Sequence, residues 1–186
     1  MKHEPPPQLD PATAARLPGQ FVSWFATRGW SPRAHQLELL AKAQRGCSTL
    51  LIAPTGAGKT LAGFLPSLVD LTERETERRT ERLEAQRRER ERRSNQPETK
   101  KHVGVAQRPP PGPGVHTLYI SPLKALATDI RRNLETPVSE MDLPVRLETR
   151  TGDTSQHARQ RQRATPPDIM LTTPEQIALL LAHPSA

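Results

Sequence analysis

The chain has 186 residues, of which 34% are apolar and only 3% aromatic. That length suits one domain with a buried core, and the low apolar content predicts that part of the chain lies outside the core. Lys and Arg outnumber Asp and Glu by 27 to 20, and this excess favours a polyanionic partner, nucleic acid first. The single cysteine, Cys47, excludes an internal disulfide and is expected to be a small buried residue. No signal peptide and no apolar stretch near the roughly 20 residues of a membrane span is present, so we expect a cytoplasmic protein.

In chain order, residues 1–19 form a proline-rich N-terminal segment, which we place outside the domain expected over residues 20–186. The first strong pattern follows at residues 48–52, an apolar run that predicts a buried strand. Residues 61–69 then predict the opening of a helix. Between them lies Ala-Pro-Thr-Gly-Ala-Gly-Lys-Thr at residues 53–60, and this order of strand, glycine loop and helix is the context of a phosphate-binding P-loop.

The residue types in this loop suit a nucleoside triphosphate. Gly56 and Gly58 allow positive φ and let backbone N–H groups approach the phosphates closely. The helix that follows points its free N–H groups and positive dipole end at the same place. We expect Lys59 to reach the β- and γ-phosphates and the Thr60 hydroxyl to ligate Mg²⁺. The predicted ATP-binding residues of the loop are Thr55, Gly56, Ala57, Gly58, Lys59 and Thr60. An ordinary glycine-rich turn is the alternative.

Residues 72–114 have a different composition. Arg, Glu, Thr and Gln dominate up to residue 93, and opposite charges at helical spacing predict a solvated helix without a core-facing side. Residues 108–114 are typical of an extended proline-rich linker. We interpret the whole segment as an exposed, partly disordered insertion within the domain. The alternative is an arginine-rich arm that adds phosphate contacts.

Strand and helix patterns alternate after the insertion. Residues 115–120, 145–149 and 169–172 predict strands, while helices are expected from about residue 124 and from Pro174. This alternation predicts an α/β fold with a mainly parallel sheet. In such sheets ligands bind at the carboxyl ends of the strands, where the polar motifs of this chain fall.

Together these motifs resemble the first RecA-like domain of a superfamily 2 helicase. Residues 29–36 resemble the Q-motif region, residues 53–60 motif I, residues 121–127 motif Ia, residues 151–154 a TGDT element and residues 173–175 motif Ib. In wording they are closest to the large helicase-related (Lhr) group, most of all its bacterial ligase-associated DEXH-box branch. The resemblance covers most of residues 20–71 and 115–186, and alanine at the first position of motif I is normal in that superfamily.

The resemblance implies roles for single residues. Gln36 would hydrogen-bond adenine, although by itself it could be any surface glutamine on a helix. Contacts with the backbone of single-stranded DNA or RNA are expected from Ser121, Lys124, Gly152, Thr173 and Pro174.

Each of these contact residues has a purely structural alternative. Ser121 and Lys124 could simply cap and solubilise a helix, Thr173 could be only an N-cap, and Gly152 could serve only a turn. The four arginines of this region are expected to form a solvated basic face rather than to read nucleic acid: Arg150, Arg159, Arg161 and Arg163. Trp24 and Trp30 are expected to pack in the core or at its rim.

One family motif does not occur in these 186 residues. ATP hydrolysis by this machinery needs a DExH acidic pair to hold Mg²⁺ and orient water, and no Asp-Glu-x-His is present. We therefore expect an N-terminal fragment of an ATP-dependent DNA helicase, acting in repair, that binds ATP weakly without hydrolysing it. Its sheet should lack a central strand beside the P-loop strand. A non-catalytic nucleotide- or nucleic-acid-binding fragment is the alternative, and ligase or nuclease partners follow from the resemblance alone.

Overall fold

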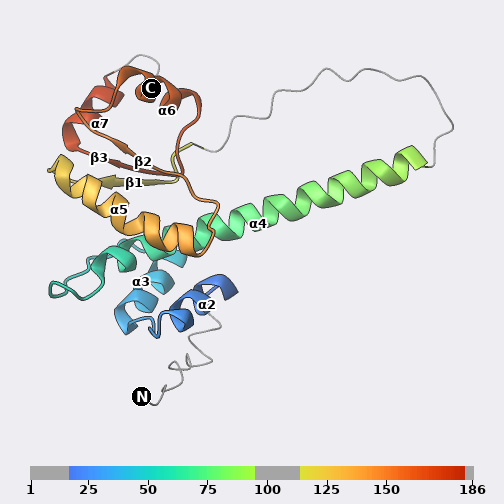
Figure 1. Ribbon diagram of the computed structural model, residues 1–186, viewed down its shortest axis with the longest axis horizontal. Helices are drawn as coiled ribbons and strands as arrows, with labels where there is room; N and C mark the ends of the chain where they lie inside the picture. Colours follow the sequence, from blue (N-terminus) through green and yellow to red (C-terminus); the bar gives the residue numbers. More distant parts are fainter. Residues whose placement is uncertain (1–16, 95–113, 183–186) are drawn as a thin grey trace.

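The computed structural model describes residues 17–94 and 114–182 (Figure 1). The elements in chain order are α2 (Gly19–Thr27), α3 (Ala34–Gln44), α4 (Lys59–Ser94), β1 (Thr117–Ile120), α5 (Lys124–Glu140), β2 (Leu147–Arg150), α6 (Gln156–Ala164), β3 (Ile169–Thr172) and α7 (Pro174–Leu181). Strands and helices alternate from β1 onwards, as the sequence pattern predicts.

The three strands form one parallel sheet in the order β1-β3-β2. All four residues of β3 are buried, because β3 is the central strand and has a neighbour on each side. Figure 1 shows α5 on one side of the sheet and α6 and α7 on the other. The prediction of an α/β fold with a parallel sheet is therefore confirmed, and all three strands end at the same edge.

The hydrophobic core lies where α2, α3 and the first turns of α4 meet α5 and the sheet. Phe21, Leu65 and Leu68 are fully buried on the helical side, and Leu134 and Leu171 close the core from α5 and β3. Each such side chain contributes about 1.5–3 kcal/mol by leaving water. This core fixes the start of α4, and with it the loop that precedes α4.

The expectation of a buried strand at residues 48–52 is wrong. This segment has no regular secondary structure and pairs with no strand in the described part of the chain, and Leu50 and Ile52 are 83% and 85% exposed. A strand is stabilised by a hydrogen-bonded neighbour and by covered faces, and here neither is present. Cys47 is exposed for the same reason, which corrects the expectation that it is buried.

The helix α4 continues for 36 residues and carries its last turns away from the rest of the molecule (Figure 1). Residues 73–92 are mostly exposed, so the solvated helix expected from the charge pattern is present. The proline-rich segments expected at residues 1–19 and 108–114 lie almost wholly outside the described residues. In residues 17–94 and 114–182 no helix is both long and apolar enough to cross a membrane.

Candidate nucleotide and nucleic-acid site

The glycine loop ends where α4 begins, at Lys59. Gly56 and Gly58 have φ of 79° and 74°, the left-handed region that glycine adopts without a steric penalty. The Gly58 carbonyl accepts the first α4 hydrogen bond from Ala62 N at 3.0 Å, so the N–H groups of the first turn have no helical partner. These groups, together with the positive end of the helix dipole, make the loop suited to an anion.

The ammonium of Lys59 folds back over the loop. It donates hydrogen bonds to the carbonyl oxygens of Ala53 and Pro54 at 2.7 and 2.6 Å, although the residue is exposed. The loop therefore places one positive charge beside its own N–H groups. A phosphate group approaching the loop would compete with these two carbonyl oxygens for the ammonium.

Gln36 lies against this loop and is only 4% exposed. Its Oε1 accepts from the N–H of Arg33 at 2.9 Å, and its Nε2 donates to the carbonyl of Gly58 at 3.4 Å. The side chain is thus the N3 partner that caps α3, and it is not the surface glutamine that the sequence left open. A pocket of about 380 Å³ lies at this point, lined by Phe25, Trp30, Ser31, Arg33, Gln36, Gly58 and Leu61.

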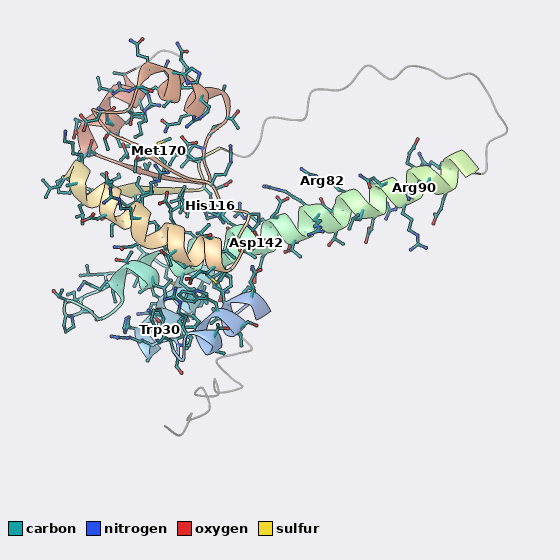
Figure 2. The ribbon with its side chains drawn as sticks, viewed as in Figure 1. Trp30, Arg82, Arg90, His116, Asp142 and Met170 are labelled. Atoms are coloured by element: carbon teal, nitrogen blue, oxygen red, sulfur yellow. The ribbon has the colours of Figure 1, made fainter. Side chains whose placement is uncertain are left out.

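Trp30 forms the rim between this pocket and a second one that reaches Thr60 and α5. It is 49% exposed, while Trp24 is 9% exposed and packs edge-on against it, with ring centroids 5.8 Å apart. The guanidinium of Arg28 lies 5.1 Å from the Trp30 centroid and is held by the carboxylate of Glu140 on α5. Figure 2 shows Trp30 beside α2 and α3. Packing at the core rim, expected for both tryptophans, is therefore observed.

The Glu140 carboxylate also accepts a hydrogen bond from the indole Nε1 of Trp24 at 2.7 Å. This bond, followed by those from Arg28, holds the pKa of Glu140 below its usual value. Arg28 and Glu140, which hold Trp24 and Trp30 in place at this pocket, were not expected from the sequence. The spacing of Trp24 on α2 and Arg28 at its C-cap, four positions apart, was the available signal.

A second group of candidate residues lies at the carboxyl edge of the sheet. Ser121 follows β1 and Thr173 follows β3, and both are 1% exposed. The two loops are joined because Ser121 N donates to the Thr172 carbonyl at 3.0 Å. The third loop follows β2, where Thr151 N donates to the Thr154 hydroxyl at 2.9 Å. Parallel register thus brings motifs separated by up to about 50 residues in the chain to one edge.

Lys124 and Asp153 link the first and third of these loops. The Lys124 ammonium donates to the Asp153 carboxylate at 2.8 Å, and both side chains are exposed. This hydrogen bond raises the pKa of Lys124 above its usual value. Such an exposed pair is worth at most about 1 kcal/mol, so a phosphate group can displace the carboxylate at little cost. The pairing with Asp153 was not expected from the sequence.

Of the structural alternatives for Gly152 and Thr173, the turn at Gly152 is observed, whereas the side-chain cap by Thr173 is not. Gly152 is exposed in its turn, a Cβ there would meet no atom within 4 Å, and its φ is not positive, so the turn itself does not demand glycine. Thr173 occupies the N-cap position of α7 but makes no side-chain cap, because its hydroxyl donates to the Glu175 carboxylate at 2.5 Å. Pro174 is the first residue of α7, as predicted, and is exposed.

The residues present fit the phosphates of a nucleotide better than they fit a free metal ion. Within residues 17–94 and 114–182 no three His, Cys, Asp or Glu side chains form a group that could hold a metal. Thr60, in the first turn of α4, is the one predicted metal ligand, and it is partly buried beside the pocket that Trp30 borders. A Mg²⁺ ion here would have to be held chiefly by the phosphates it accompanies.

Comparison with known proteins gives consistent matches. The model of the DEAD/DEAH box helicase family matches residues 33–185. A Lhr helicase and probable uracil glycosylase of Mycolicibacterium smegmatis is 34% identical over 168 residues, which are 85% of this chain and 9% of that protein. An ATP-dependent helicase Lhr-Core of Methanothermobacter thermautotrophicus is 35% identical over 149 residues, 75% of this chain and 14% of that protein.

Among solved structures, that of the Mycobacterium smegmatis helicase Lhr bound to ssDNA and AMP-PNP aligns with a TM-score of 0.66 and 30% identity. The alignment covers 93% of this chain and 19% of the Lhr chain. These 186 residues therefore span less than a fifth of the length of the relatives named here.

Proposed function

Because this chain belongs to the DEAD/DEAH box helicase family, we propose that it is the N-terminal ATP-binding part of an ATP-dependent DNA helicase or translocase. The observation that carries this proposal is the contact between Gln36 and Gly58. Through this contact the buried amide of Gln36 meets the glycine loop at the start of α4. The pocket lined by Gln36, proposed to hold the base, is therefore continuous with the loop proposed to hold the phosphates.

In the proposed complex the loop holds the triphosphate. Backbone N–H groups of residues 55–60 surround the phosphates, and Lys59 exchanges its two carbonyl partners for phosphate oxygens. The Thr60 hydroxyl ligates the Mg²⁺ that accompanies ATP. Gln36 retains one N–H and one lone pair beyond its two present bonds, and these are available to the edge of adenine. The exposed face of Trp30 borders the same pocket.

The carboxyl edge of the sheet is the proposed strand-binding surface. Lys124, Ser121 and Thr173 would hold phosphates of single-stranded DNA without reading its bases, with Gly152 and Pro174 at the points of closest approach. The ssDNA in the related Lhr structure supports this choice of partner. DNA over RNA, a role in repair, and ligase or nuclease partners belong to the same proposal and rest on the resemblance.

A nucleotide titration tests the first half of this function. We expect a fluorescent ATP analogue with Mg²⁺ to bind the chain, and Lys59→Ala to weaken binding about 10- to 100-fold, because a charge-assisted contact of roughly 1.5–3 kcal/mol is lost. Lys42→Ala is the matched control, since Lys42 lies on α3 and pairs with Glu38. Equal affinity of the wild-type and Lys59→Ala chains would overturn the proposal.

The same titration separates binding from catalysis. No Asp-Glu-x-His occurs in these 186 residues, so the expected result is binding without turnover. Phosphate release that requires Lys59 would show that another acid in the chain completes the reaction.

A further inference from the structure

Arg150 is the last residue of β2 and does not belong to the solvated basic face that the sequence predicts. It is only 4% exposed. Its Nε is buried and has no hydrogen-bond partner among the described residues. Arginine cannot lose its charge in a protein, so this guanidinium stays positive where water reaches it poorly. A buried charge without a partner destabilises the folded state, so a ligand that supplies the opposite charge would be bound favourably there.

The face on which Arg150 lies follows from the strand period. Residues 148 and 150 point to the same side of β2. The Glu148 carboxylate on that side accepts hydrogen bonds from Arg161 Nη2 and Gln162 Nε2 of α6, at 3.1 and 2.9 Å. The side chain of Arg150 therefore lies on the side of β2 that α6 covers, next to Glu148 on that face and nearer the carboxyl edge of the sheet.

Two further arginines, Arg159 and Arg163, are four residues apart on α6 and therefore share one face of that helix. Burial lowers the pKa of Arg150, and the positive charges of Arg163 and Arg159 lower it further. Arg159 donates only to backbone carbonyls, those of Thr154, Thr151 and Gly152, at 2.9, 3.2 and 3.1 Å. In the described part of the chain no carboxylate pairs with Arg150, Arg159 or Arg163. Arg159 thus reaches the backbone next to Arg150, Arg163 lies one turn further along α6, and no carboxylate in the described part of the chain balances these three charges.

By contrast, the neighbouring basic residues are neutralised. Arg161 pairs with Glu148 at 3.1 Å, and Arg146 pairs with Asp168 at 3.8 Å. Arg161 and Arg146 thus each have a carboxylate partner, whereas Arg150, Arg159 and Arg163 have none among the described residues. Carboxylates are therefore available in this region, and only the cluster of three arginines is left without one.

We propose that Arg150, Arg159 and Arg163 form a site for one phosphate group, beside the loop that follows β2. Guanidinium groups hold phosphate by paired, charge-assisted hydrogen bonds, and one phosphate neutralises the cluster that the fold leaves unbalanced. The phosphate comes either from a nucleic-acid strand on the carboxyl edge, a source that rests on the proposed function, or from free phosphate in solution.

Thermal unfolding of Arg150→Met tests the site without nucleic acid. Since an uncompensated buried charge is replaced by an apolar chain of similar length, the Tm in phosphate-free buffer should be unchanged or higher. Inorganic phosphate at constant ionic strength should raise the wild-type Tm by about 4 °C more than that of the variant, at roughly tenfold its Kd. Any phosphate bound by the glycine loop affects both proteins equally.

Two other variants complete this experiment. Arg163→Met changes an exposed residue, so it should fold normally and also lose part of the phosphate effect. Arg82→Met is the matched control, because Arg82 is exposed on the far part of α4 (Figure 2) and should keep the full effect. A drop in Tm for Arg150→Met without phosphate, or equal phosphate effects in the wild-type, Arg150→Met and Arg163→Met chains, would overturn the site.

Binding of a labelled oligothymidylate over a range of salt concentrations identifies the source of the phosphate. If the strand supplies it, Arg150→Met should bind at least about tenfold more weakly, and the slope of log affinity against log salt should fall by about 0.7, the value for one lost single-strand contact. If the wild-type chain binds no oligonucleotide but keeps its phosphate effect, the strand function fails and free phosphate is the ligand. If strand binding and phosphate effect are both the same in the variant, the site fails and the proposed function stands.

Discussion

Single glycines decide whether the nucleotide loop can form, and Gly58 does so in two ways. Its φ of 74° is costly for any residue with a Cβ, by about 1–2 kcal/mol. A Cβ at this position would also lie 2.9 Å from Nε2 of Gln36. Gly63, in the second turn of α4, has neither restriction, since its φ is not positive and a Cβ added there would meet no atom within 4 Å.

At this scale we predict opposite effects for two identical substitutions. Gly58→Ala should lower the free energy of unfolding by about 1–2 kcal/mol and displace Gln36, so that ATP binding is lost. Gly63→Ala should raise the free energy of unfolding by about 0.5–1 kcal/mol and leave ATP binding unchanged, because alanine is the better helix residue. Urea unfolding and nucleotide titration of both variants give the comparison. Equal ATP binding by Gly58→Ala and the wild-type chain would contradict the close contact at Gln36.

Among the elements, α4 combines two helices of different character. Its first turns bury Leu65, Leu68 and Val69 in the core. Beyond Thr72 the contacts of α4 are local: the Thr76 hydroxyl donates to the carbonyl of Thr72 at 2.9 Å, a bond that adds little to helix stability. The outer turns are stabilised by exposed ion pairs such as Arg87–Glu91, at 2.9 Å. Each such pair contributes only about 0.3–0.5 kcal/mol, so the outer part of α4 is much less stable than its root.

Hydrogen exchange should reveal this division of α4. Amides of residues 76–92 are expected to exchange far faster than those of residues 62–71, because opening the outer turns breaks no core contact. The difference should widen in high salt, which screens the exposed ion pairs. Equal protection from exchange along the whole of α4 would contradict this prediction and would mean that another surface of the protein covers residues 76–92. Residues 124–134 of α5, which also pack on the core, are the internal reference.

At the scale of the whole molecule, several large apolar side chains remain outside the core. Leu50 and Ile52 in the segment before the glycine loop are almost fully exposed, and Leu118 and Ile120 on β1 are 45% and 50% exposed. Each therefore adds little to the stability of these 186 residues, in contrast to Leu65, which is fully buried.

We predict that Leu50→Lys combined with Ile52→Lys lowers binding of a hydrophobic dye and raises solubility, with a change in Tm of less than about 2 °C. Leu65→Ala is the control, and it should cost about 2–5 kcal/mol because it leaves a cavity in the core. Dye fluorescence and thermal unfolding measure both effects. A large loss of Tm in the double lysine variant would show that residues 48–52 are packed in solution.

The sequence by itself determined the three strands and the helix α5 after residue 115, the start of α7 at Pro174, the charged helix and the family, because these depend on local periodicity, turn chemistry and motif spacing. Helix α6 was not predicted. The family match confirms the resemblance to DEAD/DEAH box helicases of the Lhr group, while the ligase-associated branch stays a prediction. The roles of the individual site residues also stay predictions.

Only the tertiary structure decided what depends on partners distant in the chain. Residues 48–52 have the pattern of a buried strand, but a strand also needs a neighbour, and none of the described residues supplies one. Arg150 is a charged residue of the kind normally found at the surface, yet its place in β2 and the covering helix α6 bury it without a counter-charge. Gln36 became a buried contact of the glycine loop for the same reason, since packing between α3 and the start of α4 fixes it, 22 residues from its partner Gly58.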